Sequence, residues 1–169
     1  MVSGMLTIRT ARPDDAVAIL RVHREAILLK AAGHYPESTL GAWALGVTPE
    51  RVARLAQQIA DPEFIVVVAE AGEEAIGYGV AVPVREQLRA LYVKPNSIGR
   101  VGTVLLAELE KRAFLTAESL RCDASLNAVA FYGAHGYTEE GRADHVLGSG
   151  ACVPCVRMKK VRPAASRAI

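Results

Sequence analysis

The chain has 169 residues, of which 51% are hydrophobic, and its formal net charge at pH 7 is +2. This length and apolar content predict one globular domain with a full core, and the small, interspersed charge does not favour nucleic-acid binding. The N-terminus lacks a basic region followed by an apolar run, and no window approaches the roughly 18–20 apolar residues of a membrane span, so we expect a cytoplasmic protein without a membrane partner.

The N-terminal third predicts a short strand followed by three helical pieces. Leu6–Arg9 alternates as a strand does, and Thr10–Pro13 leads into a helix that Gly33 is expected to end. A second helical piece lies around Trp43. A third opens at Thr48–Glu50, because its threonine can cap the helix and its proline fits the first helical position.

Between these helical pieces, His34, Tyr35 and Trp43 form a cluster that could line a substrate pocket. Trp43 is the only tryptophan in the chain. A half-buried tryptophan whose N–H is satisfied is the structural alternative, and the sequence leaves both interpretations open.

The middle of the chain predicts neighbouring strands of a sheet. Phe64–Glu70 is a β-branched run typical of a buried central strand, and Ala75–Val82 follows a glycine turn as its hairpin partner. Gln87–Val93 is the next strand, after the proline that ends the hairpin. Gly77 and Gly79 open like a dinucleotide fingerprint, but no third glycine and no helix follow. We therefore interpret them as positions of close backbone approach.

The stretch Leu88–Ala113 combines a strand, a glycine-punctuated loop at Gly99–Thr103 and a helix with apolar residues at helical spacing. Glycines ahead of a helix let the chain come close to a ligand, and the unpaired N–H groups of the first turn suit a phosphate. No Gly-Lys-Ser/Thr follows, so ATP and GTP are disfavoured, and no nicotinamide or flavin site is proposed. An ordinary connection between strand and helix is the alternative.

The C-terminal part predicts strands around one short helix. Leu120–Ala124 has the pattern of a strand, and Ser125–His135 that of a short helix whose start Ser125 or Asn127 can cap. Gly136 is placed to end that helix in a left-handed conformation. The remaining predicted elements are two strands and a frayed tail: Tyr137–Arg142, Val153–Met158 and the residues from Arg162.

The three cysteines are an odd number for a disulfide framework. Cys152 and Cys155 have the CxxC spacing of redox or zinc sites, but no second pair of ligands is in sight and the flanking residues predict a strand. Residues three apart in an extended segment point to opposite faces, so the two sulfurs should diverge. We interpret Cys122, Cys152 and Cys155 as reduced structural thiols and expect no metal site.

Four segments, in their order and spacing, together resemble the GNAT superfamily of acyl-CoA-dependent N-acyltransferases: Leu91–Pro95, Gly99–Leu106, Ala124–Tyr132 and Gly136–Tyr137. Pro154–Met158 is also similar to many small bacterial members, and the resemblance extends from Leu6 to Lys159. It implies an α/β (α+β) fold with a central mixed, mostly antiparallel sheet of about seven strands. The sheet would be splayed between the fourth and fifth strands, with helices on both faces. A single domain would occupy residues 1–169, with its core at 6–160 and a flexible tail at 161–169.

The resemblance implies that acetyl-CoA lies in the splayed cleft, with its pantetheine amides paired to the backbone of Leu91, Tyr92 and Val93. The family's pyrophosphate loop falls on residues whose N–H groups would hold the phosphates: Gly99, Arg100, Val101, Gly102 and Thr103. Compared with the family's usual order, one glycine is missing between Arg100 and Val101, and Ile98 stands where Gln or Arg is common. We expect this irregular loop to weaken cofactor binding.

In this family a neutral amine attacks the thioester carbonyl directly, without a covalent enzyme intermediate. The residue that matches the proton donor to the leaving thiolate is Tyr132, and a core aromatic is its structural alternative. Asn127 would reach the pantetheine or a backbone carbonyl, with helix capping as the alternative. The backbone N–H near Val93 would stabilise the developing oxyanion.

Relatives often carry the general base as a glutamate at the position that Gln87 occupies here. Glu86, one residue earlier, is therefore the candidate catalytic base. A shift of one residue on a strand reverses the face of the side chain unless a bulge restores it. Asp123 and His34 are the other candidates, and water is a further route for the proton.

These features predict an N-acetyltransferase that moves the acetyl group from acetyl-CoA to a primary amine on a small molecule or peptide. The alternative is a catalytically weak or inactive GNAT-like module that binds or senses acyl-CoA. The acceptor would be recognised by variable segments around His34, Tyr35, Trp43 and His145. The sequence leaves open whether the chain forms a homodimer.

Overall fold

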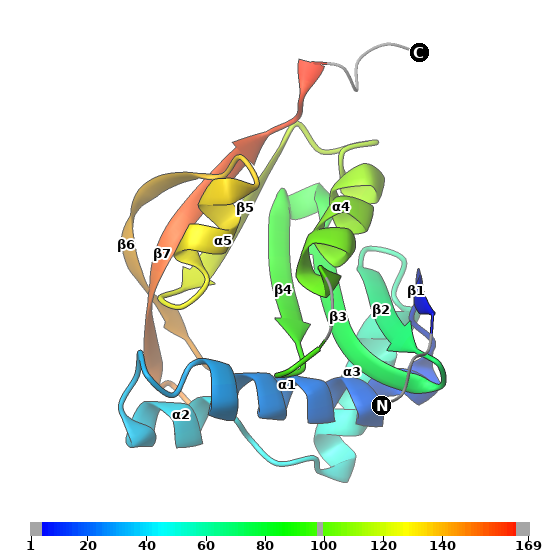
Figure 1. The fold of residues 1–169 in the computed structure, drawn as a ribbon, viewed down its shortest axis with the longest axis vertical. Coiled ribbons are helices and arrows are strands. Elements are labelled where there is room, and N and C mark those ends of the chain that lie inside the picture. Colours follow the sequence, from blue (N-terminus) through cyan, green and yellow to red (C-terminus); the bar gives the residue numbers. More distant parts are fainter. Residues whose placement is uncertain (1–4, 98–99, 165–169) are drawn as a thin grey trace.

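The computed structural model describes residues 5–97 and 100–164 (Figure 1). Its elements are, in chain order, β1 (Leu6–Thr10), η1 (Pro13–Asp15), α1 (Ala16–Lys30), α2 (Glu37–Trp43), α3 (Pro49–Ala60), β2 (Ile65–Ala71), β3 (Glu74–Val82), η2 (Pro83–Arg85), β4 (Gln87–Val93), α4 (Val101–Ala113), β5 (Ser119–Ser125), α5 (Val129–Ala134), β6 (Thr138–Val146) and β7 (Cys152–Val161).

The strands of the described residues form one seven-stranded sheet in the order β1-β2-β3-β4-β5-β7-β6. Every neighbouring pair is antiparallel except β4 and β5, which are parallel and share only the Gln87–Arg121 pair. Beyond that pair the two strands diverge, as Figure 1 shows. The predicted mixed sheet, splayed between its fourth and fifth strands, is confirmed.

Helices cover both faces of the sheet, which explains the apolar run in β2. Val67 packs in a buried cluster with Leu105 and Leu109 of α4. Val66 and Val68, its neighbours in sequence, pack in a second cluster with Ile19 of α1. Because successive strand residues point to opposite faces, all three valines are buried, as expected for a central strand.

The two glycines of β3 allow α4 to approach the sheet closely. A Cβ atom on Gly77 would lie 2.9 Å from Leu105 Cδ1, and one on Gly79 would overlap Leu109 Cδ1. The predicted close approach at these glycines is confirmed, and what approaches them is the apolar side of α4.

Most predicted boundaries agree with the structure, and the N-terminal helices differ slightly. Thr48 caps α3 by accepting a hydrogen bond from the Arg51 N–H at 3.4 Å. The helix α1 ends at Lys30 and not at Gly33, because the His34 N–H bonds to the Ala31 carbonyl and turns the chain first.

The prediction of a helix from Ser125, capped by Ser125 or Asn127, is wrong. Ser125 still pairs with Cys155 as the last residue of β5, because the ladder with β7 extends that far. The helix α5 begins at Val129 with Ala128 at its N-cap and no capping side chain. Its predicted end is confirmed, since Gly136 has a φ of 88°.

The C-terminal strands are longer than predicted, and structure continues past residue 160. Val161 pairs with Ser119, and the Arg162 N–H bonds to the Glu118 carbonyl at 2.8 Å. These contacts hold the first residues of the segment that was predicted to be a frayed tail. On β7, Cys152 is exposed and Cys155 is buried, so their side chains diverge as expected. No helix in the described part of the chain is long and apolar enough to cross a bilayer.

Candidate active site

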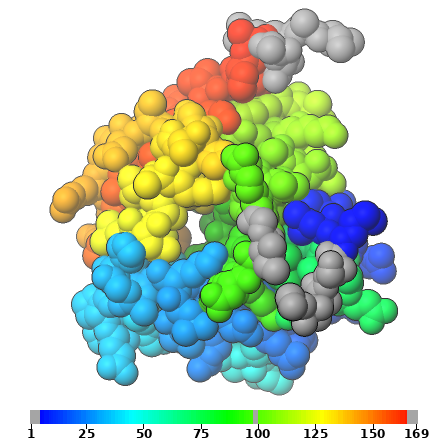
Figure 2. Space-filling view, in the orientation of Figure 1, coloured from blue at the N-terminus to red at the C-terminus, as the bar shows by residue number. Residues whose placement is uncertain are grey.

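A cavity of about 380 Å³ lies where β4 and β5 diverge. Its walls come from the end of β4, the start of α4, the segment leading into α5, and the C-terminal part of α1. Figure 2 shows the corresponding hollow between the yellow α5 region, the blue α1–α2 region and the green β4 segment. The cavity therefore sits at the only parallel junction in the described sheet.

The strand β4 contributes Leu91, Tyr92 and Val93 to the cavity wall. Leu91 and Val93 also pack against the α4 cluster, whereas Tyr92 packs on the opposite face of the sheet. Because β4 and β5 form no described bridge beyond Gln87–Arg121, the edge of β4 that faces the gap has no strand partner. A ligand with amide groups can therefore pair with this backbone edge.

The first turn of α4 forms a second wall, with Arg100, Val101, Gly102 and Thr103 lining the cavity. Among the described residues no side chain caps this helix, and no acidic residue lies in its first turn, so its N–H groups remain available to an anion. A Cβ on Gly102 would lie 3.4 Å from the Phe131 ring, which shows how closely α4 and α5 approach. Predicted cofactor residue Gly99 and the neighbouring Ile98 lie outside the described residues.

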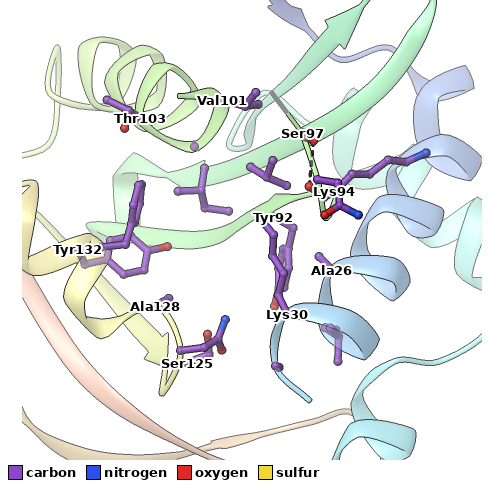
Figure 3. A pocket seen from close by; sticks show the side chains of 18 of the residues that line it. Ala26, Lys30, Tyr92, Lys94, Ser97, Val101, Thr103, Ser125, Ala128 and Tyr132 are labelled. Atoms are coloured by element: carbon purple, nitrogen blue, oxygen red, sulfur yellow. Dashed lines mark hydrogen bonds between the residues drawn. The ribbon is translucent and has the colours of Figure 1, made fainter. Parts of the chain in front are cut away.

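The third wall carries Tyr132, which is 6% exposed and packs edge-on against Phe131 and Tyr137 at 5.3 Å between ring centroids. Figure 3 shows its hydroxyl pointing into the cavity. Burial raises the pKa of Tyr132 well above its usual value, so the hydroxyl keeps its proton at neutral pH. Asn127 also lines the cavity, and its buried Oδ1 has no hydrogen-bond partner among the described residues.

The predicted substrate cluster is only partly assembled at the cavity. Trp43 lines it, with its ring 6.3 Å from that of Tyr92. Tyr35 is buried, and its hydroxyl donates to the Pro154 carbonyl at 2.6 Å and accepts from the Leu126 N–H at 2.9 Å. His34 is exposed and is not among the cavity-lining residues. Tyr35 thus joins segments of the scaffold, and His34 lies apart from the site.

Glu86, the predicted base, does not line the cavity. It follows η2 in a left-handed conformation, with φ of 50°, and its carboxylate accepts a hydrogen bond from the Ser119 N–H at 3.0 Å. That hydrogen bond lowers the pKa of Glu86. A bulge does occur in β4, where Arg89 is skipped in the pairing with β3, but it lies beyond Glu86. A role for Glu86 as base stays a prediction that its position does not favour.

Two smaller hollows, of about 50 Å³ each, adjoin the cavity and share Trp43, Tyr92 and Ser125 with it. Asp123 lines both of them, and Arg89 does too. The sequence offered Asp123 as a minor candidate base but gave no signal for Arg89, because a bulge position cannot be read from the alternation of a strand.

Among residues 5–97 and 100–164, no group of three or more metal-binding side chains is close enough to hold an ion.

Comparison with known proteins agrees with this geometry. The solved structure of the GCN5-related N-acetyltransferase from Rhodopseudomonas palustris is 28% identical, with a TM-score of 0.81 over 95% of this chain and 98% of that one. The PaiA N-acetyltransferase from Thermoplasma acidophilum, solved in complex with coenzyme A, is 22% identical, with a TM-score of 0.72 over 93% and 99% of the two chains. A ribosomal-protein-alanine N-acetyltransferase from Brucella melitensis is 24% identical, with a TM-score of 0.68 over 92% and 99%.

A search of curated proteins found no match. The family model described as "Acetyltransferase (GNAT) domain" matches residues 33–161. This match spans the divergent strands, the start of α4 and the Tyr132 segment, which are three of the four parts of the cavity wall. The chain therefore belongs to the GNAT family of acetyltransferases.

Proposed function

We propose that this chain transfers the acetyl group of acetyl-CoA to a primary amine of a small molecule or peptide, with Tyr132 as the proton donor to the leaving thiolate. The observation that carries the proposal is that one cavity unites three features. These are the open edge of β4, the uncapped start of α4 and the buried hydroxyl of Tyr132.

The cavity wall offers polar groups to two parts of acetyl-CoA, its phosphates and its pantetheine arm. The phosphates would accept hydrogen bonds from the first-turn N–H groups of α4, with Arg100 beside them. The pantetheine amides would pair with the edge of β4, and an amide N–H would satisfy the Oδ1 of Asn127, which has no partner among the described residues. The similar structure from Thermoplasma acidophilum was solved with coenzyme A, which supports this choice of ligand.

In the proposed reaction the amine nitrogen attacks the thioester carbonyl carbon, so a C–N bond forms and the C–S bond breaks. The amine loses one proton to a base before attack and a second after it. The departing sulfur takes a proton from the Tyr132 hydroxyl, which the second amine proton replaces. The N–H near Val93 remains the predicted donor to the oxyanion.

The test compares the wild type with Tyr132→Phe in an assay of free CoA release from acetyl-CoA across a panel of amines. We expect kcat to fall about 100-fold, since the positioned proton donor is lost, while the KM for acetyl-CoA changes by no more than about twofold. Tyr137→Phe is the matched control, because Tyr137 is a buried neighbour of Tyr132 that does not line the cavity.

Two outcomes would count against the proposal. Equal rates in the wild type and Tyr132→Phe would remove Tyr132 from the mechanism. Tight binding of acetyl-CoA by the wild type without turnover of any amine would instead favour an acyl-CoA-binding or sensing module.

A further inference from the structure

The far side of the splayed gap holds a histidine paired with a carboxylate. His145 Nδ1 on β6 lies 3.2 Å from Asp123 Oδ2 on β5. The other oxygen of Asp123 accepts a hydrogen bond from Arg157 Nε, also at 3.2 Å. Because only a protonated ring nitrogen can donate to a carboxylate, this contact selects the tautomer with hydrogen on Nδ1 and leaves the Nε2 lone pair free.

This pair lies on the opposite face of the sheet from Tyr132. Cys122 and Ala124, the neighbours of Asp123 on β5, pack in the same buried cluster as Tyr132 and α4. Strand alternation therefore directs Asp123 to the other face. The gap connects the two faces, because Asp123 and Tyr132 line one of the small hollows together, and Asp123 and His145 line the other.

None of the other histidines lines the gap. All four histidines of the chain lie in its described part, and His145 alone lines any of the three hollows. His135 is bonded at both ring nitrogens, to the Phe131 carbonyl at 2.7 Å and Thr103 Oγ1 at 3.1 Å. His23, on α1, packs edge-on against Tyr92 of β4. His34 is exposed and lies away from the site.

We propose that His145, oriented by Asp123, is the general base that takes the proton from the ammonium of the acceptor, which enters from the face that carries this pair. The inference rests on the proposed transfer of acetyl to an amine. The ammonium gives one proton to His145 Nε2, and the neutral amine then attacks the thioester that lies on the Tyr132 side. His145 is the catalytic residue of this step, and Asp123 is a positioning residue.

The charged and titratable groups around His145 suit a base that must pass its proton on. They come from three other strands and from its own strand: Asp123 on β5, Arg157 and Cys155 on β7, Arg89 on β4 and Asp144 on β6. The His145 side chain is 48% exposed, so solvent can accept the proton directly.

The test uses His145→Gln and Asp123→Asn with two acceptors, a strongly basic alkylamine from the panel and hydroxylamine, which is largely neutral at pH 7. For the alkylamine at pH 7 we expect kcat/KM to fall about 100-fold in His145→Gln and about 10-fold in Asp123→Asn. The acidic limb of the pH profile should disappear in the first variant. With hydroxylamine as the acceptor, kcat/KM should fall by no more than about threefold in either variant, because this amine needs no prior deprotonation.

Glu139→Gln is the control, since Glu139 is an exposed carboxylate on the same strand that lines none of the hollows. It should keep the wild-type profile. An unchanged acidic limb in His145→Gln, or equal losses for both acceptors, would overturn this inference while leaving the Tyr132 result intact. A wild type that does not bind acetyl-CoA in calorimetry would overturn the proposed function and this inference together.

Discussion

The two faces of the splayed gap are built in different ways. The Tyr132 face comes from one continuous stretch, β4 through α5, and its side chains are mostly buried and apolar. The opposite face brings together Trp43 from α2, Asp123 from β5 and His145 from β6. These residues are far apart in sequence, and the last two are charged or titratable and partly exposed. A cofactor with constant chemistry can be held by a local motif, whereas a variable acceptor is met by residues that only the fold assembles.

The largest expected effect concerns the cofactor face. Thr103→Glu would place a carboxylate in the cavity at the first turn of α4, where it competes with the phosphates for the same N–H groups. We expect binding of CoA to weaken about 1,000-fold, or about 4 kcal/mol, measured by calorimetry. Val104→Glu adds the same charge one residue later at an exposed position outside the cavity. Equal losses in both variants would contradict phosphate binding at this turn.

The next effect concerns a half-buried histidine behind the acceptor face, His23. Burial lowers the pKa of His23 to about 4, and this ring lies 4.7 Å from that of Tyr92. As the pH falls, the histidine of the unfolded chain binds a proton near pH 6.5, whereas His23 in the folded chain does so only at lower pH. The contribution of neutral His23 to the free energy of unfolding is therefore complete above pH 6.5. As the pH falls toward 4, this free energy decreases by roughly 3 kcal/mol.

Urea unfolding at pH 7 and pH 4.5 measures this loss. His23→Phe keeps an aromatic ring beside Tyr92 and removes the titrating group, so its stability should fall less with acid than that of the wild type. The same pH dependence in both proteins would show that the fold does not lower the pKa of His23.

A smaller effect tests whether Tyr35 stabilises the fold or contacts the substrate. Tyr35→Phe removes the hydroxyl that joins Pro154 to Leu126, and it leaves the Pro154 carbonyl and the Leu126 N–H without this partner. We expect the free energy of unfolding to fall by about 2 kcal/mol, with KM values for both substrates within about twofold of the wild type. Unchanged stability together with a raised KM for the acceptor would instead return Tyr35 to substrate recognition.

The smallest effect is expected at His34, which the sequence grouped with Tyr35 and Trp43. Its side chain is exposed and outside the hollows, so His34→Ala should change stability by less than about 0.5 kcal/mol. The rate with each amine of the panel should stay the same within error. A selective loss with one acceptor would extend the acceptor face to include His34.

The sequence by itself determined the order of strands and helices and the residue types of the Tyr132 face. The apolar runs, the Thr48 cap and Gly136 are local signals, because burial on one face and capping depend on neighbours a few residues away. The strand Gln87–Val93 and the helix up to Ala113 were predicted correctly for this reason.

Only the tertiary structure decided which distant residues meet. The start of α5 was predicted too early because pairing with β7 extends β5 through Ser125. Glu86 was placed near the chemistry by its position in sequence, but a left-handed turn and the Ser119 N–H hold it elsewhere. The contact between Asp123 and His145 depends on how β5, β7 and β6 curve together, which involves packing across the whole sheet and leaves no pattern in any single segment.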